Sequence, residues 1–467
     1  MNARAGSMKQ RTWLRVPVLV VALGLAASAQ FGGLGGFGSA GAGNPMATTT
    51  PQVEFRPWLT ANGTWYENQV GALSASGLGT SRYGWNAGGG VSGGKSWERT
   101  TVAGGYTGTY MKSSGRANSL ANGLNQVGML SISHRMNQQH GVSIAQYGGS
   151  SIGGFGYGAP YGGFGGFGMG SVGALRDIDS GGIGGFGDPA QNGLVDNEIF
   201  GSRVNFYGAD AKYVYQPNLR WSYGVSGKAG LVRRSQKTLT DLNHYGAGVR
   251  ASYRVDERSS VSALYQYSQF NYVGLFGGNH VQSAGLQYSH SFNERTQFQM
   301  EAGAFYYSST FLGTVKIDPA LAALIGTTSS LTIQNKVKVG WVGGALLSHN
   351  FSKLHASAHY DHGITPGNGT ILASERDMAT GSVGTSVKRV NFSTYGSYYR
   401  MTGLLQTGAK TQTFTVGVSG GLRVIGDLHL TANYGAARYL FASPMKQWQK
   451  YATAGLTWSP GGAAFRY

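Results

Sequence analysis

Residues 219–231 read LRWSYGVSGKAGL, and the two-residue rhythm of this stretch decides the fold class. Every odd-numbered position from Trp221 to Val225, and again Ala229 and Leu231, is apolar. The positions between them are polar, small or charged and include Arg220, Ser222, Ser226 and Lys228. Because successive side chains of a β-strand point to opposite faces, one face of this segment is apolar and the other polar. The pattern predicts an amphipathic strand.

The same rhythm recurs, between turn signals, along about 400 residues. Residues 413–424 repeat it, with Phe414, Val416 and Val418 on one face and Thr413 and Thr415 on the other. About eighteen such segments are expected, with boundary errors of about 2–4 residues. They cover residues 53–66, 82–95, 99–111, 122–135, 140–149, 199–216, 219–232, 241–255, 259–272, 279–292, 295–309, 332–350, 353–364, 376–389, 392–403, 411–425, 427–441 and 447–459.

The connections between these segments alternate between short and long. The short ones are 96–98, 136–139, 217–218, 256–258, 293–294, 352, 390–391 and 426–427. The longer ones are 67–81, 112–121, 150–198, 233–240, 273–278, 310–331, 365–375, 404–410 and 442–446. Short periplasmic turns and long extracellular loops are typical of outer-membrane barrels. The sequence therefore predicts an all-β fold, a transmembrane antiparallel up-and-down β-barrel with both termini in the periplasm. A soluble propeller would require a motif recurring about every 40 residues, and none is found.

Composition agrees with a barrel better than with a soluble protein or a helical membrane protein. Charged residues make up 12% of the chain, against about a quarter in soluble domains, and mean hydropathy is −0.18. An apolar outer belt combined with a polar lumen averages to such a value. One large domain is expected, because no shift in composition divides the repeating region.

The N-terminal region predicts export from the cytoplasm. Basic residues precede an apolar run over 16–29, which ends in Ala27-Ser28-Ala29 and is shorter than the ~20 residues of a spanning helix. We expect a signal peptide over 1–29, a Gly-rich flexible periplasmic segment over 30–52 and the barrel over 53–467. Within the barrel, the Gly/Phe-rich segment 150–198 is predicted to be an extracellular loop.

Charge suggests the partners. Removing residues 1–29 deletes four basic and no acidic residues, which lowers the formal net charge from +18 to +14. Such a charge attracts anions, either solutes in a pore or lipopolysaccharide beside outer-membrane lipid. Nucleic-acid binding is not expected, because the basic residues are scattered singly. The chain has no Cys, so disulfide and thiol chemistry need not be considered. The oligomeric state stays open.

The chain resembles bacterial outer-membrane porin-like barrels. The resemblance lies in its N-terminal leader and, from Val53 onward, in its amphipathic strands and the aromatic residues at strand ends. The resemblance implies a C-terminal aromatic signal for the barrel-assembly machinery. Tyr467 is terminal, but Pro460 interrupts any strand leading to it, because proline cannot donate to the ladder. Trp458 ends an alternating run. Either residue can serve as the signal.

Assigning the apolar face to lipid divides the strand residues into two sets. The outward set is Tyr207, Ala209, Ala211, Tyr213, Trp221, Tyr223, Val225, Tyr245, Ala247, Val249, Ala251, Tyr253, Leu286, Tyr288, Val337, Val339, Trp341, Phe414, Val416 and Val418. The predicted lumen-lining set is Asp210, Lys212, Arg220, Lys228, Arg250, Arg254, Glu301, Lys336, Lys338, His355, His359, Asp361, Arg423 and His429. Basic residues outnumber acidic ones in the second set. A barrel of this size is wide enough to hold a water channel. The alternative is a filled interior across which these charges pair with one another.

Motifs that suggest catalysis or metal binding are weak. Residues 90–94 and 417–421 match the G-x-S-x-G pattern of serine hydrolases, but both lie inside predicted strands without the strand-to-helix elbow that the motif needs. His355 and His359 stand about 13 Å apart on one strand, too far to share an ion. Only His359 and Asp361, at about 7 Å, are within reach of a common ion. No catalytic residue, metal site or cofactor is predicted, and the chain is not expected to be an enzyme.

The function predicted from these features is passive diffusion of small polar solutes, with a preference for anions, through an outer-membrane pore. Two alternatives stay open. The first is a surface-adhesion or structural barrel that uses the Gly/Phe-rich loop, whose regularly spaced aromatic residues are adhesive. The second is an outer-membrane hydrolase.

Overall fold

The computed structural model describes residues 56–67, 82–114, 122–152, 203–237, 239–275, 277–316, 329–367, 371–405, 409–440, 448–458 and 460. These residues form eighteen strands. The strands are β1 (Arg56–Glu67), β2 (Arg82–Ser96), β3 (Thr100–Ser113), β4 (Gly123–Arg135), β5 (His140–Ile152), β6 (Arg203–Tyr215), β7 (Trp221–Arg234), β8 (Leu242–Arg254), β9 (Ser259–Tyr272), β10 (Asn279–Asn293), β11 (Thr296–Lys316), β12 (Ser329–Asn350), β13 (Leu354–Gly367), β14 (Leu372–Val387), β15 (Val390–Gly403), β16 (Lys410–Ile425), β17 (Leu428–Leu440) and β18 (Trp448–Trp458).

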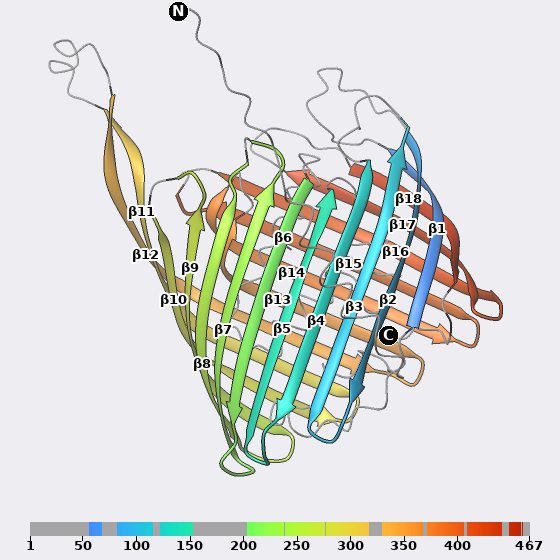
Figure 1. Cartoon of the computed structure of the whole chain (residues 1–467), viewed down its shortest axis with the longest axis horizontal. Coiled ribbons are helices and arrows are strands. Elements are labelled where there is room, and N and C mark those ends of the chain that lie inside the picture. Colours follow the sequence, from blue (N-terminus) through green and yellow to red (C-terminus); the bar gives the residue numbers. More distant parts are fainter. Residues whose placement is uncertain are drawn as a thin grey trace, which may run out of the picture.

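Each strand pairs antiparallel with its sequence neighbours, and the first strand pairs with the last. The ladder between β1 and β18 runs from Leu59 opposite Trp458 to Glu67 opposite Lys450. The result is a closed antiparallel up-and-down barrel (Figure 1), which confirms the predicted fold. Closure matters physically because it gives the first and last strands a partner and so removes the two free edges that an open sheet would have. Among the described residues, no helix is long and apolar enough to cross a membrane.

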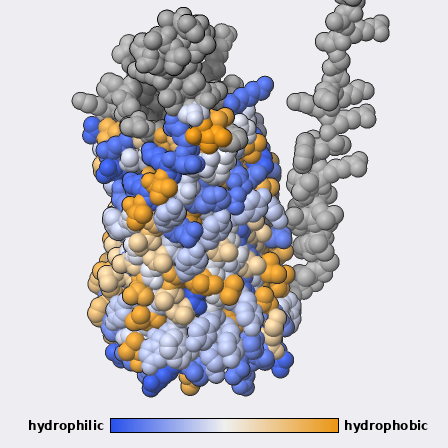
Figure 2. Space-filling view, turned by 90° about the vertical axis from the view of Figure 1, so that its left-hand side faces the viewer, coloured by the Kyte–Doolittle hydropathy of each residue, from blue (hydrophilic) through white to orange (hydrophobic). Residues whose placement is uncertain are grey.

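Side chains alternate between an apolar outer face and a more polar inner face. On β12, Val337, Val339 and Trp341 are 55%, 67% and 54% exposed, and the residues between them are less exposed. Apart from Tyr253, which is only partly exposed, the other outward-assigned tyrosines, tryptophans, valines and leucine follow the same alternation. Figure 2 shows hydrophobic residues gathered below mid-height, with hydrophilic residues toward both ends. An apolar band flanked by polar ends is what the hydrocarbon of a bilayer requires.

Several short turns are closed by an Asn or Asp side chain. Asn218 Oδ1 accepts hydrogen bonds from the backbone N–H groups of Arg220 and Trp221, at 2.9 and 2.8 Å. Asp256 Oδ1 accepts them from Arg258 and Ser259, at 2.6 and 2.7 Å. The hydrogen bond from the Arg258 backbone, followed by that from the Ser259 side chain, holds the pKa of Asp256 below its usual value. These residue types favour such turns, which explains why the short connections were readable from the sequence.

Two hairpins extend beyond their predicted ends. β11 was expected to end at residue 309 and β12 to begin at 332, but their ladder continues to Lys316 opposite Ser329. In Figure 1 this hairpin rises above its neighbours. β14 begins at Leu372 instead of 376, because residues 372–375 pair with the end of β13. Segments predicted as loops are therefore strand in both hairpins.

Some predictions concern residues outside the described ranges. They include the signal peptide over 1–29, the segment over 30–52 and nearly all of the loop 150–198. Trp458 is the last residue of β18, and Tyr467 lies outside the described residues. The choice between them as an insertion signal stays a prediction.

The seam that closes the barrel depends on a glycine. Gly455 lies opposite Asn62, and a Cβ at Gly455 would overlap the Ala61 carbonyl oxygen and the Asn62 side-chain oxygen. We expect Gly455→Ala to lower the free energy of unfolding by about 1–3 kcal/mol, the usual cost of overpacking. Urea unfolding of the refolded barrel would measure this loss.

Gly63 is the matched control, because it lies on the same seam. A Cβ there would meet the Ala454 carbonyl oxygen at 3.9 Å, an ordinary contact. Gly63→Ala should therefore cost much less. Similar losses for the two variants would contradict the steric explanation.

Candidate functional site

The structure places thirteen of the fourteen predicted lumen residues in strands. They are Asp210 and Lys212 on β6, Lys228 on β7, Arg250 and Arg254 on β8, Glu301 on β11, Lys336 and Lys338 on β12, His355, His359 and Asp361 on β13, Arg423 on β16 and His429 on β17. By register and alternation, all of them lie on the face opposite the exposed apolar side chains. Asp210 and Lys228 stand directly opposite each other. That solutes pass along these residues stays a prediction.

Arg220 is the exception. The prediction began a strand at residue 219, but the turn closed by Asn218 extends through Arg220, and β7 begins at Trp221. The Arg220 guanidinium donates a hydrogen bond to Tyr253 Oη at 3.4 Å. Arg220 therefore lies in a short turn at the periplasmic rim of the barrel. Its side chain contacts Tyr253, which belongs to the outward-facing set, and not the inner wall.

Arg250 is held on the inner wall by three side chains that sequence reasoning did not single out. Its Nε donates to Ser252 Oγ at 2.9 Å, and its Nη2 donates to Ser262 Oγ at 3.1 Å and to Gln287 Oε1 at 2.7 Å. These partners come from β8, β9 and β10. The alternation on each strand is the signal that would have found them, because all three occupy inward positions. The network fixes a cationic group against the lumen wall.

The wall formed by β1, β2, β17 and β18 has a different chemistry, because buried hydroxyl and amide side chains line it. Asn62 Nδ2 donates to Asn86 Oδ1 at 2.8 Å and to Thr60 Oγ1 at 3.1 Å. Thr60 and Thr457 share a hydrogen bond of 3.1 Å, and Asn433 donates to Thr453 at 3.0 Å. The charged residues predicted for β6–β13 therefore face a neutral polar wall.

The β13–β14 hairpin leaves the barrel wall near its tip. β12 and β13 pair from Asn350 opposite His355 to Gly343 opposite His362, and there their ladder stops. The last residues of β13, up to Gly367, pair with β14 alone among the described residues. The tip then contacts β9: Tyr272 Oη donates to the Pro366 carbonyl oxygen and accepts from the Ala373 N–H, both at 2.6 Å. The hairpin tip thus lies inside the barrel.

An apolar cluster surrounds this contact. It joins inward-facing residues of β6–β12 to Ile364, Ala373 and Leu404. The wall residues are Val204, Phe206, Val232, Leu242, Leu264, Phe270, Tyr272, Val281, Phe305, Tyr307 and Val342. Sequence reasoning placed only polar residues in the lumen, so it missed this packed layer. A signal existed in β9, where Leu264, Phe270 and Tyr272 place large apolar side chains on the inward face beside its serines and Gln266.

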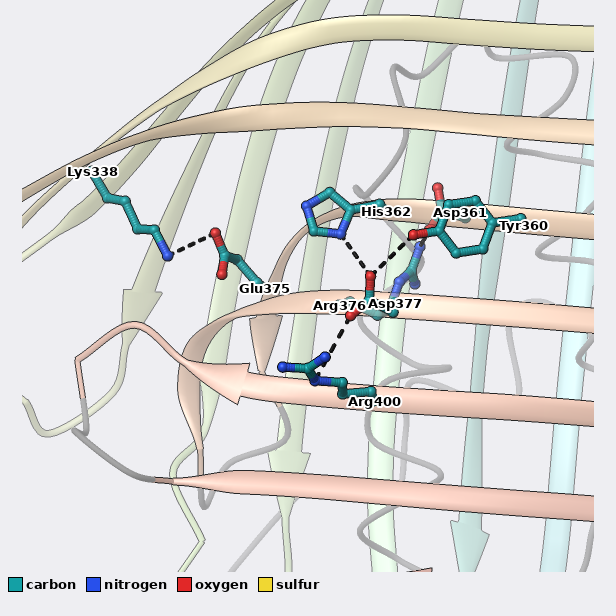
Figure 3. A network of polar contacts seen from close by, with 8 residues as sticks. All are labelled: Lys338, Tyr360, Asp361, His362, Glu375, Arg376, Asp377 and Arg400. Atoms are coloured by element: carbon teal, nitrogen blue, oxygen red, sulfur yellow. Dashed lines mark hydrogen bonds and ion pairs between the residues drawn. The ribbon is translucent and has the colours of Figure 1, made fainter.

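Ion pairs fix the base of the hairpin (Figure 3). Arg376 of β14 pairs with Asp361 of β13, and both side chains are less than a tenth exposed. Lys338 Nζ of β12 lies 2.8 Å from Glu375 Oε1 of β14, across the gap where the β12–β13 ladder has ended. Arg376 did not appear among the predicted lumen residues, because the strand was expected to begin there. These pairs place two of the predicted lumen charges in salt bridges.

A second polar group centred on Asp377 lies on the opposite face of the hairpin base. His362 Nδ1 is 2.7 Å from Asp377 Oδ1, and Tyr360 Oη donates to the same oxygen at 3.2 Å. Arg400 Nε is 3.9 Å from Asp377 Oδ2, and the His362 ring stacks on Trp341 at 3.9 Å between centroids. Figure 3 shows these side chains converging on Asp377. Because Trp341 is more than half exposed, this group faces outward.

The catalytic and metal-binding patterns do not gather into sites in the described part of the chain. Asp361, the only predicted carboxylate partner of His359, is paired with Arg376. No group of three or more His, Cys, Asp or Glu residues that could hold a metal ion is found among the described residues. Both G-x-S-x-G segments lie within strands, β2 and β16, and Ser419 Oγ shares a hydrogen bond with Ser393 Oγ.

A closed antiparallel barrel with an apolar outer band and a polar inner face is the architecture of bacterial outer-membrane proteins. The chain is an outer-membrane β-barrel. No protein-family model matches the sequence, and no curated protein matches it.

Solved structures with a similar fold include the ferric citrate transporter FecA in its unliganded form, with 10% identity and a TM-score of 0.42 over 87% of this chain. The chain spans 64% of the length of that transporter. OccAB3 of Acinetobacter baumannii has 10% identity and a TM-score of 0.36, covering 87% of this chain and 99% of the other. OccK2 of Pseudomonas aeruginosa has 10% identity and a TM-score of 0.38, covering 87% and 98%.

Proposed function

We propose that this barrel is a passive outer-membrane channel for small polar solutes and that it prefers anions. The observation that carries the proposal is the inner face, where basic side chains outnumber acidic ones. This face carries the basic side chains of Lys212, Lys228, Arg250, Arg254 and Lys336. Against them stand only three carboxylates from the predicted lumen set, those of Asp210, Glu301 and Asp361. A wall of low dielectric constant focuses the field of fixed charges into the space that it encloses and so raises the local concentration of anions.

The mechanism is diffusion without catalysis. Solutes would pass between the cationic side chains of β6–β12 and the neutral hydroxyl and amide wall of β1, β2, β17 and β18. The apolar layer beside Tyr272 would set the size limit, because it is the packed level of the interior. Outside the barrel, the apolar band would contact lipid, and the basic residues near the extracellular ends would contact lipopolysaccharide phosphates.

Ion selectivity tests this proposal. In planar bilayers with a salt gradient, the reversal potential of the wild-type protein should favour chloride over potassium. Lys212→Glu should shift it toward potassium, because the side chain lies on the inner face between Ser143 and Ser226, where the new carboxylate meets no steric conflict.

Lys410→Glu is the matched control, since it makes the same change of charge on the exposed outer face of β16. It should leave the reversal potential nearly unchanged. A potassium preference of the wild-type protein would refute the anion preference, and the absence of any current would refute the channel.

A further inference from the structure

The lipid-facing wall is hollowed across β12 to β16. A groove of about 440 Å³ lies there, lined mainly by apolar and small residues. One cross-strand row of outward residues explains the hollow, because it reads Leu347, Ala358, Gly381, Gly396 and Val416. Two large side chains thus flank three small ones. Since lipid hydrocarbon meets this face of the barrel, an apolar chain can fill the groove.

Three basic side chains lie at the periplasmic edge below this groove. They are Lys353, in the turn between β12 and β13, and Lys388 and Arg389, in the turn between β14 and β15. All three are exposed. The two turns are neighbours, because Thr385 Oγ1 near the end of β14 donates a hydrogen bond to the Lys353 carbonyl oxygen at 2.5 Å. Lysine and arginine at this level of a membrane protein favour anionic headgroups.

Acidic residues near this edge belong to the two flanking turns and have basic residues of their own. Asp427 Oδ1 lies 3.9 Å from Arg423 Nη2, and Glu294 is followed directly by Arg295. Residues 351–353 and 388–389 include no acidic residue. These two turns, which we call the basic turns, therefore present only positive charge to the membrane.

Lys388 occupies a position whose backbone favours a different residue. Its φ is 52°, and the pairing of Val387 with Val390 makes it the first residue of a two-residue hairpin turn. A positive φ at that position favours glycine, because a Cβ is strained there. The backbone preference of the turn therefore does not account for lysine, whereas an anionic ligand for its ammonium group does.

The distance from the basic turns to the groove matches the length of one phospholipid. Gly381 lies seven residues before Lys388, which corresponds to about 23 Å along the strand at about 3.3 Å per residue. For a strand tilted by about 40°, this is about 18 Å across the membrane. A lipid leaflet with its headgroup is about 20 Å deep. A phosphate at the basic turns thus places the end of its acyl chain at the row of small residues.

We propose that the groove and the basic turns form a binding site for an anionic phospholipid of the periplasmic leaflet. The basic turns bind its phosphate, and the row from Ala358 to Gly396 holds an acyl chain. A second copy of the chain fits this face less well, because a twofold contact would bring the basic turns of the two copies together. The site does not depend on the proposed channel function.

Site-specific fluorescence quenching tests the proposal, because the chain has no native Cys. Ala379→Cys places a bimane label beside the groove, two residues from Gly381 on the same face. Ala247→Cys places one on the outward face of β8, whose turn to β9 carries acidic as well as basic residues. The folded, heat-modifiable barrel is reconstituted in mixed bilayers. Quenching by brominated phosphatidylglycerol and by brominated phosphatidylcholine then gives their relative association constant at each label.

At the Ala379→Cys label, phosphatidylglycerol should be favoured by at least about fivefold, the factor that one basic residue contributes near an anionic headgroup. At the Ala247→Cys label, the two lipids should associate almost equally. Equal association constants at the two labels would overturn the proposal. So would weak quenching by both lipids at Ala379→Cys together with disulfide-linked dimers of that variant, since the occupant would then be a second copy.

A triple substitution tests the headgroup. Replacing Lys353, Lys388 and Arg389 together by Gln should abolish the preference at the Ala379→Cys label. The matched control replaces three exposed residues of other short turns by Gln and removes the same charge, at Arg99, Arg220 and Arg258. It should leave the preference nearly unchanged. An equal loss in the two triple variants would refute a defined site, because the basic residues would then act only through net charge.

A glycine substitution tests the chain. Gly396→Leu fills the groove, and its Cβ fits because the nearest atoms are 3.9 Å away. The relative association constant should fall severalfold, because the acyl chain loses its contact with the wall. Gly227→Leu on the outward face of β7 is the control, with its nearest atom at 4.0 Å, and should change nothing. An unchanged preference in Gly396→Leu would overturn the role of the groove.

Discussion

Replacing Arg376 by Met is expected to lower the free energy of unfolding by about 3–5 kcal/mol, the largest stability loss that we predict for a single substitution. The guanidinium is 2% exposed, and its partner Asp361 is buried as well. Met fills a similar volume without charge, so packing changes little, but Asp361 is left as an uncompensated carboxylate in a region of low dielectric constant. Urea unfolding of the refolded barrel in detergent or lipid would measure the loss.

A double-substitution cycle separates the charge from the packing. Asp361→Asn combined with Arg376→Met removes both charges, so the pair of changes should cost less than Arg376→Met alone. A double variant as unstable as the sum of the two single variants would contradict a role for the ion pair. A loss below about 1 kcal/mol for Arg376→Met would mean that water reaches Asp361.

The strands were predictable because two physical signals act locally. Alternation of side chains along β7 and β16 reports which face meets lipid, and the Asn or Asp of a short turn reports where a strand must end. Register then follows from short turns, since a two-residue connection leaves little freedom for the pairing of its strands. The predicted strand number agrees with the structure for this reason.

The lumen was only partly predictable, because its decisive contacts join residues far apart in sequence. Tyr272 meets Pro366 and Ala373 across the barrel, although these partners are 94 and 101 positions away in the sequence. Alternation shows that Tyr272 faces inward, but it carries no information about what the side chain meets there. Arg376 was missed because residues 365–375 contain Pro366 and Gly367, which indicate a loop, whereas tertiary contacts extend the hairpin through them.

Ala247→Arg is expected to impair assembly of the barrel more than Ser226→Arg, because the two sites lie on opposite faces of the wall. Ala247 is exposed at the middle of β8, between Tyr245 and Val249, which are 46% and 51% exposed on the same face. Arg near the midplane of the lipid face of a barrel costs about 2–4 kcal/mol, because the charge must enter hydrocarbon or distort the bilayer. The fraction of heat-modifiable, folded protein after refolding into bilayers would measure the effect.

Ser226→Arg is the matched control, because Ser226 is also small and lies on β7, the strand next to β8. Its side chain faces inward, opposite Lys212 on β6 and Gly248 on β8. The new guanidinium can stay hydrated there, and its repulsion from Lys212 is weak in water, so the folded fraction should fall little. Overpacking is common to both sites, and the difference between them therefore isolates the solvent that each face meets. Equal losses, or a larger loss for Ser226→Arg, would mean that β7 and β8 do not separate lipid from an aqueous lumen.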